Sequence, residues 1–95
     1  MDDKVTREKL KKYFSITKEA LDKVKSSPID GSRKEHADDF LDMCQRYYDD
    51  AMHFEKKGEL VLAYGALNYA HAWLDAGARI GLFKVKDSRL FAADD

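Results

Sequence analysis

Polar side chains that can do acid–base or metal chemistry recur at helical spacing in the stretch ALNYAHAWLDAGARIGLF. They are Asn68, His71, Asp75 and Arg79, with Tyr64 one turn earlier on the same side. At 100° per residue, the first four fall within about 80° of one another on a helix. A histidine with a carboxylate four residues away can act as a general base or supply two metal ligands. We call Tyr64, Asn68, His71, Asp75 and Arg79 the polar strip.

Neither activity is complete within the polar strip. A nucleophile or a third metal ligand must come from another segment, and the sequence places no Ser, Cys or further His to supply it. The structural alternative is an edge beside a buried helix face, where His71 bonds a neighbour and Asp75 pairs with Arg79. We favour this structural interpretation over a binding site, and a binding site over catalysis. We expect no catalytic residue, metal or cofactor.

A second pair with metal-binding chemistry is Asp49 and His53, which share one face of the preceding helical segment. Carboxylate and imidazole four residues apart can both bind zinc. Two ligands make a weak site, however, and Asp42 and Arg46 on the same face are ordinary solubilising charges. We interpret this face as solvated.

Basic residues follow one side of the N-terminal segment, and a line of positive charge can track a phosphate backbone. These residues are Lys4, Arg7, Lys11, Lys18 and Lys25, which we call the basic face. Glu8, Glu19 and Asp22 lie nearby and interrupt the line, and no aromatic residues alternate with it. An ordinary solvated surface is therefore favoured, and nucleic-acid binding is kept as an alternative.

The composition bounds the class of protein. The chain has 95 residues, with 44% hydrophobic and 37% charged side chains and a net charge of −1, which suits one helix-rich domain. Residues 1–34 carry ten Lys/Arg against six Asp/Glu, and residues 35–62 carry three against eight. The opposite net charges of these two ranges fit segments that pack together. The single Cys44 forms no intrachain disulfide, and no membrane span or signal peptide is present, so we expect a cytoplasmic protein.

Apolar periodicity predicts an all-α, antiparallel, up-down-up three-helix bundle with helices at about residues 3–26, 32–57 and 59–83. The first helix is expected to continue through Ser15–Thr17, although Thr17 is an alternative helix start. Ser32 with Glu35 matches a capping box for the second helix. Gly58 suits the left-handed position that ends it. Residues 1–84 would form one domain, and residues 85–95, which show little periodicity, a loosely ordered tail.

The third predicted helix is apolar over about 200° of its circumference. One seam alternates large and small residues: Leu60, Ala63, Leu67, Ala70, Leu74, Gly77 and Gly81. The other consists of Leu62, Ala66, Tyr69, Trp73, Ala76, Ile80 and Phe83. Two seams predict two helical neighbours, which places this helix at the centre of the core. Because glycine inside a helix is unfavourable, we expect Gly77 and Gly81 to lie close to the second helix.

The stretch YYDDAMHFEKKGELVLAYGALNYAHAWLDAGARIGLF, residues 47–83, resembles the core motif of an archaeal family known as domain of unknown function 357. The preceding stretches YFSITKEALDKV and ADDFLDMCQRYY resemble the family's leading helices, so the likeness covers most of the chain. Where Ala72 stands, the family often has glycine. The resemblance implies a short, spectrin-like three-helix fold. It brings no established activity, and hence no functional residues.

The preferred function is therefore a small non-enzymatic helical module that acts on an unknown protein partner or through homo-oligomerisation. The first alternative is a nucleic-acid accessory protein that uses the basic face. The second is a weak metal-binding or acid–base enzyme that uses His71 and Asp75.

Overall fold

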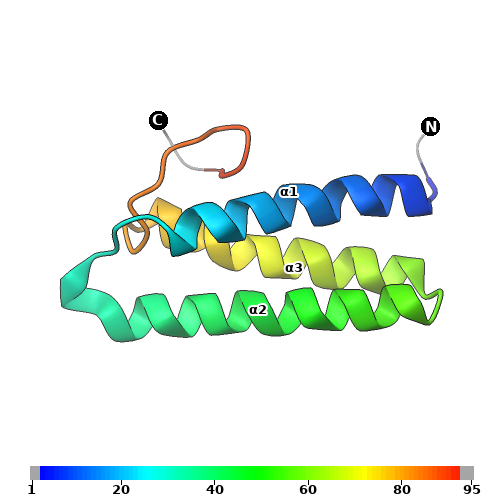
Figure 1. The fold of residues 1–95 in the computed structure, drawn as a ribbon, viewed down its shortest axis with the longest axis horizontal. Coiled ribbons are helices and arrows are strands. Elements are labelled where there is room, and N and C mark those ends of the chain that lie inside the picture. The colour runs from blue at the N-terminus through cyan, green and yellow to red at the C-terminus, as the bar shows by residue number, and fades with distance from the viewer. Residues whose placement is uncertain (1–2, 93–95) are drawn as a thin grey trace.

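The computed structural model describes residues 3–92, and this part of the chain forms three α-helices (Figure 1). α1 spans Arg7–Lys25, α2 spans Lys34–Lys56 and α3 spans Leu60–Arg79, with a short 3₁₀ turn at Gly31–Arg33 before α2. Consecutive helices run in opposite directions, so α1 and α3 are parallel. The predicted all-α three-helix bundle is confirmed. None of the helices within residues 3–92 has the length and apolar character needed to cross a bilayer.

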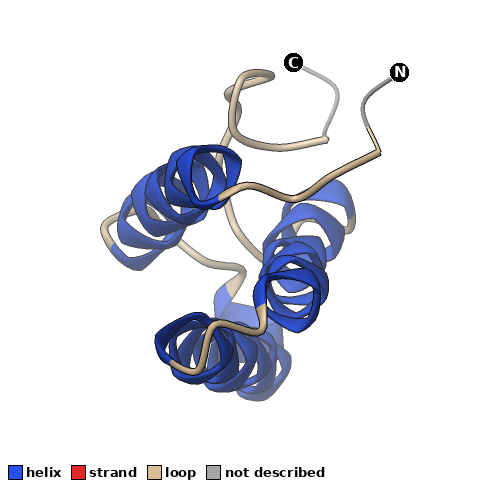
Figure 2. Ribbon diagram, turned by 90° about the vertical axis from the view of Figure 1, so that its right-hand side faces the viewer, coloured by secondary structure: helices blue, strands red, loops and turns tan. Residues whose placement is uncertain are grey.

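α3 packs against both other helices, as predicted. The prediction that a helical neighbour covers each of its two apolar seams is wrong, because Leu62, Tyr69 and Ile80 of the second seam are exposed. α2 packs along α3 for most of its length and α1 packs on α3, whereas the α1 and α2 backbones scarcely approach each other. Seen end-on, the helices occupy the corners of a triangle (Figure 2). Aromatic side chains fill the wider gap between α1 and α2. The Phe14 ring, for example, meets the Tyr48 ring edge-on with centroids 5.5 Å apart.

The first seam of α3 is buried and supplies the middle of the core. Ala63, Leu67, Ala70 and Leu74 are each at most 1% exposed. Small residues on α2, including Ala37 and Ala51, face the same core and are fully buried. Alanine on both helices permits close approach, which explains why the α2–α3 contact is the tightest in the bundle.

A side-chain cap begins α1, whereas the N-cap residues of α2 and α3 make no side-chain capping hydrogen bond. α1 is continuous through Thr17, and its N-cap is Thr6, whose hydroxyl oxygen accepts a hydrogen bond from the Lys9 N–H. In the loop before α2, the prediction that Ser32 caps the helix is wrong. The Asp30 carboxylate accepts the hydrogen bond from the Ser32 N–H at 3.0 Å and caps the 3₁₀ turn. The N-cap position of α2 is Arg33, which makes no side-chain capping hydrogen bond, so the capping chemistry of this loop serves the 3₁₀ turn that precedes α2.

Glycine ends both α2 and α3. Gly58 has φ +77°, and the Glu59 N–H donates back to the Phe54 carbonyl oxygen, as expected for a left-handed helix end. Gly81 adopts the same conformation at φ +76°, and the Leu82 N–H donates to the Gly77 carbonyl oxygen. α3 therefore ends at Arg79 instead of residue 83. The expectation that Gly81 faces α2 from within the helix is wrong.

The prediction that Gly77 lies close to α2 is also wrong. A Cβ atom added at Gly77 would lie 2.2 Å from a ring carbon of Phe83. The close neighbour is thus the chain that follows α3, and not α2. Phe83 is 1% exposed, and its backbone forms an antiparallel bridge with Ile29 in the loop between α1 and α2. The missing side chain at Gly77 makes room for the returning chain.

The segment after α3 packs against the bundle through Ala92, which corrects the expectation of a loose tail for residues 85–92. Val85, Leu90 and Phe91 are at most 6% exposed. The chain loops back over α1 (Figure 1) and turns at Asp87, whose carbonyl oxygen accepts hydrogen bonds from the Leu90 and Phe91 N–H groups. Its apolar residues have no helical or alternating period, so the sequence pattern did not reveal their burial. Residues 93–95 lie outside the described part.

Candidate functional site

The polar strip lies in the groove between α1 and α3, and the returning C-terminal segment closes one end of that groove. Asn68, His71 and Asp75 line a cleft of about 230 Å³ together with residues of α1 and the C-terminal segment. Tyr64 lies one turn earlier, where its ring meets the Tyr13 ring edge-on at 5.4 Å. Arg79 lies outside this cleft and lines another with Lys84 and Lys86. The structure therefore brings together most of the polar strip, but not all five residues.

His71 connects three parts of the molecule. Its Nδ1 atom lies 2.9 Å from the hydroxyl oxygen of Thr17 on α1, and its Nε2 atom lies 2.6 Å from the carbonyl oxygen of Leu90. A carbonyl oxygen only accepts, so Nε2 carries the proton and donates to Leu90. In the neutral ring, Nδ1 then accepts from the Thr17 hydroxyl. Both nitrogens have protein partners, and the ring has no nitrogen left for a substrate.

Asp75 has a different partner from the one that the spacing predicted. Its Oδ1 atom accepts a hydrogen bond from the Ala92 N–H at 3.0 Å, whereas His71 Nε2 lies farther away at 3.6 Å. The carboxylate thus fixes the end of the described chain, and the His71–Asp75 contact is secondary. Neither residue has the geometry of a general-base pair with a free imidazole nitrogen.

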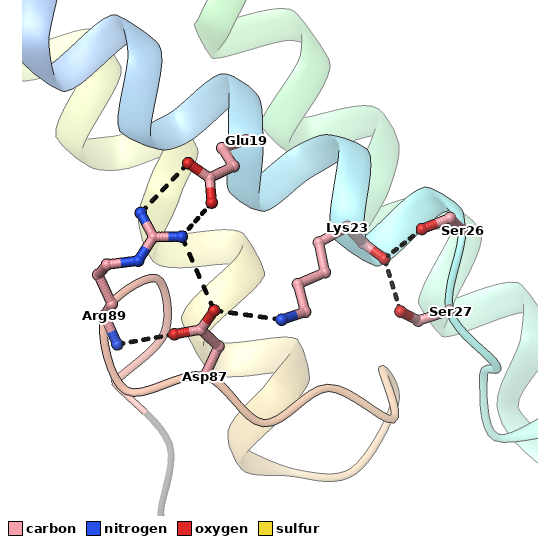
Figure 3. A network of polar contacts seen from close by, with 6 residues as sticks. All are labelled: Glu19, Lys23, Ser26, Ser27, Asp87 and Arg89. Carbon is pink, nitrogen blue, oxygen red and sulfur yellow. Dashed lines mark hydrogen bonds and ion pairs between the residues drawn. The ribbon is translucent and has the colours of Figure 1, made fainter.

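Ion pairs hold the C-terminal segment against α1, as Figure 3 shows. Arg89 pairs with Glu19, and Lys23 Nζ lies 3.1 Å from Asp87 Oδ2. The hydrogen bond from Arg89 lowers the pKa of Glu19, and the hydrogen bond from Lys23 lowers the pKa of Asp87. These four residues and the Thr17 hydroxyl were not among the sequence candidates. Each contact joins residues at least 54 positions apart along the chain, which a local pattern does not reveal.

The basic face lies along the α1–α2 boundary, where acidic and polar groups meet part of it. Arg7 forms an ion pair with Glu55 of α2 at 2.8 Å, and Lys18 pairs with Asp22 at 2.7 Å. Lys25 donates to the side-chain oxygen of Gln45. Lys4 precedes α1 and is exposed, and Lys11 lines a groove between α1 and α2. Among these contacts, the Arg7–Glu55 ion pair is the one that joins opposite charges of α1 and α2.

The Asp49–His53 face of α2 is exposed to solvent. Asp49 accepts a hydrogen bond from the Gln45 side-chain amide at 3.0 Å, and the His53 ring lies against Phe54. Within residues 3–92, no three His, Cys, Asp or Glu side chains gather closely enough to hold a metal ion.

A second candidate surface lies on the solvent side of α3 and was not expected. It carries exposed apolar and small residues, which we call the outer face of α3: Val61, Leu62, Gly65, Tyr69, Ala72, Ala76 and Ile80. Val61 is 72% exposed, Ile80 51% and Leu62 50%. From Leu60 to Ala78 the only charged residue is Asp75, which points instead to the C-terminal segment. The second apolar seam of α3 is thus largely uncovered.

Stacked aromatic rings border the outer face of α3 on the side of α2. The rings of Tyr47 and Tyr69 stack with centroids 4.3 Å apart, and the Trp73 ring continues the stack 6.1 Å from Tyr69. Phe40 meets Trp73 edge-on at 5.0 Å. Tyr47, Leu62 and Tyr69 also line a shallow groove of about 410 Å³ between α2 and α3. Rigid rings with polar tips are typical of surfaces that bind protein.

Comparison with known proteins shows that the chain matches a family to which no activity is assigned. The family model described as "Protein of unknown function (DUF357)" matches residues 12–83, which include all three helices except the first residues of α1. No curated protein and no solved structure matches the chain.

Proposed function

We propose that this chain, which belongs to the DUF357 family, is a non-enzymatic module that binds protein through the outer face of α3. The observation that carries the proposal is the combination of exposed apolar side chains and absent charge on this face. Burying apolar surface contributes roughly 25 cal/mol per Å². Soluble monomers rarely leave a large contiguous apolar patch in water, and such patches are typical of interaction sites.

The surroundings of the polar strip support a binding module over an enzyme. Thr17 and Leu90 contact the His71 ring from two sides, so both imidazole nitrogens have partners. An acid–base reaction needs one of those nitrogens to face the substrate. The hydrogen bonds of His71 and Asp75 are instead accounted for by the packing of the C-terminal segment.

The contacts of the basic face likewise favour protein binding over nucleic-acid binding. Arg7 and Lys18 are paired with carboxylates, and pairing reduces the charge that phosphates would meet. Exposed ion pairs are individually weak. On the outer face of α3, by contrast, Val61 is an apolar side chain that is 72% exposed.

Site-specific photocrosslinking inside the cell tests this proposal. A photoreactive amino acid replaces Val61 on the outer face, and in a matched control it replaces Asp39, which is exposed on α2. We expect protein adducts from position 61 and none from position 39. Adding Ala72→Glu to the first chain should abolish its adducts, because the charge would have to be buried. Equal adducts from both positions, or none from position 61, would overturn the proposal.

A further inference from the structure

We propose that a second copy of this chain covers the outer face of α3, with the two α3 helices antiparallel and a two-fold axis level with residue 71. This inference rests on the proposed function and names its partner. A partner must bring an apolar, uncharged helix surface to this face, because a charge buried against it would be costly. The outer face of α3 has this character from Val61 to Ala76, and Arg79 lies beyond it at the C-terminal edge of the face. Over that length, one copy presents the kind of surface that the other copy needs.

The order of residues along α3 is self-complementary in this arrangement. In an antiparallel pair about residue 71, positions equally far before and after that residue lie at the same level. Leu62 is then level with the partner's Ile80, and Tyr69 with the partner's Trp73. At 100° per residue, each of these pairs lies on the side of the face nearer α2. Exposed apolar groups thus meet exposed or half-buried apolar groups at both ends and at the centre.

Small residues between these groups allow the helices to approach closely. Gly65 and Ala76 lie near the centre line of the outer face, and both are exposed. Gly65 is level with the partner's Ala76, to within one residue. A Cβ atom added at Gly65 would meet nothing within 4 Å in the single chain. The bundle therefore gives no packing reason for glycine at this position, whereas a second helix would.

Charge also favours the antiparallel arrangement. Arg79, Lys84 and Lys86 line one cleft at the C-terminal end of α3, and Asp50 borders the groove beside Val61 at the other end. Antiparallel pairing brings the Arg79 end of one chain toward the end of the other chain that carries Asp50. It also places the positive end of each α3 macrodipole near the negative end of its neighbour.

The available area approaches that of an ordinary dimer interface when α2 takes part. α3 has 20 residues and is about 30 Å long. With the aromatic border on α2 the surface is two helices wide, about 20 Å, which gives a footprint of roughly 600 Å². An interface of standard size takes roughly 800 Å² of accessible surface from each partner. The dimer would thus join two α2–α3 hairpins, leaving α1 outside.

Sedimentation equilibrium of the purified chain tests the dimer. At roughly 100 μM we expect twice the chain mass of 10.9 kDa, since standard interfaces bind with micromolar or tighter affinity. Ala72→Glu should raise the dissociation constant at least about tenfold with unchanged helical circular dichroism, and Val61→Lys should do the same. Ser15→Glu, a small-to-charged change at an exposed position of α1, is the matched control and should remain dimeric. A monomeric wild-type chain, or equal effects of Ala72→Glu and Ser15→Glu, would overturn the proposal.

Single cysteines test the direction of the pair. Ala72→Cys lies beside the proposed axis and should form an intermolecular disulfide readily. Val61→Cys should not, because about 30 Å would separate it from its own copy in an antiparallel pair. A parallel pair would link at both positions, which would overturn the proposed arrangement. Native Cys44 does not interfere, because it is fully buried and burial raises its pKa to about 11.

The two proposals fail in different ways. If position 61 forms adducts in the cell only with another protein and the purified chain is monomeric, the homodimer is wrong and the binding module stands. If the chain is dimeric through another face and position 61 forms no adduct, both are wrong.

Discussion

The Nε2 atom of His71 lies 2.6 Å from the carbonyl oxygen of Leu90, which joins the middle of α3 to a segment without secondary structure. The same ring reaches Thr17 of α1 through Nδ1. His71 is therefore a structural connection among α1, α3 and the C-terminal segment. This role accounts for a histidine on the polar strip without invoking catalysis.

Removing either end of this connection should destabilise the fold. We expect Thr17→Val, which keeps the shape and removes the hydroxyl, to lower the free energy of unfolding by about 1–2 kcal/mol. His71→Ala should lower it by about 1–3 kcal/mol, because two hydrogen bonds are lost. Urea titration followed by circular dichroism measures both. Ser15→Ala, exposed on α1, is the control and should stay within about 0.5 kcal/mol of the wild type. Wild-type stability of both His71→Ala and Thr17→Val would contradict the structural role.

The packed C-terminal segment leads to a second prediction. Phe91 is 2% exposed, so Phe91→Ala should cost about 3–5 kcal/mol as a buried aromatic side chain is deleted. Lys86→Ala changes an exposed residue of the same segment and should cost little. Thermal unfolding of the two variants measures the difference. Equal melting temperatures would mean that this segment is loosely attached in solution.

Acid should weaken the attachment of the C-terminal segment to α1. The pKa of Glu19 is lowered from its ordinary 4.5 by the hydrogen bond from Arg89, and that of Asp87 from 3.8 by the hydrogen bond from Lys23. A carboxyl with a lower pKa in the folded state binds fewer protons there than in the unfolded state. Its stabilisation is complete above the unfolded pKa and is lost as the pH falls through the folded pKa.

We therefore expect the urea midpoint to fall as the pH drops below about 4.5, and to fall less in a chain with Glu19→Gln and Asp87→Asn. The matched control is Glu35→Gln, an exposed carboxyl of α2 outside this network, which should follow the wild type. Because the ion pairs are exposed, added salt should reduce the difference between the double variant and the wild type. If the double variant were as acid-sensitive as the wild type, these contacts would not contribute.

Local patterns predicted the helices well because each one depends on residues within a few turns. The continuous α1 and the glycine end at Gly58 are of this kind. The burial of the C-terminal segment was not predicted, because Leu90 and Phe91 are covered by partners far away in the chain. The exposure of the outer face of α3 was not predicted either, because periodicity reports where apolar residues lie, and not what covers them. The residues of α3 that the neighbouring helices bury, such as Leu67 and Leu74, lie on the opposite side of the helix.

For the polar strip, too, the features that depend on local spacing were predicted, and the contacts with distant segments were not. Spacing alone correctly placed Asn68, His71 and Asp75 on one side of α3. It did not identify Thr17 or Leu90 as the partners of His71, since those contacts follow from how α1 and the C-terminal segment pack. A helical i, i+4 pair is a weak predictor when a third segment offers a better acceptor, and here the Leu90 carbonyl oxygen is closer to Nε2 than Asp75 is.

The last prediction concerns Gly77 and its neighbour Phe83. A Cβ atom at Gly77 would lie 2.2 and 2.4 Å from two carbons of the Phe83 ring, far inside van der Waals contact. The gain of roughly 0.5–1 kcal/mol that alanine brings in a helix cannot offset this overlap. We expect Gly77→Ala to lower the free energy of unfolding by about 1–3 kcal/mol in urea titrations.

Two further variants identify Phe83 as the cause. Gly65→Ala is the matched control, since nothing lies within 4 Å of an added Cβ there, and in the monomeric chain it should stabilise by about 0.5–1 kcal/mol. Using the Ala72→Glu background for all variants removes any effect of association. Phe83→Leu costs stability by itself, because the ring is buried, but it also removes the ring atoms that the methyl group of Gly77→Ala would overlap. The double variant should therefore lose less than the sum of the two single changes. Additive losses would mean that the Phe83 ring moves aside and that another neighbour limits the space at Gly77.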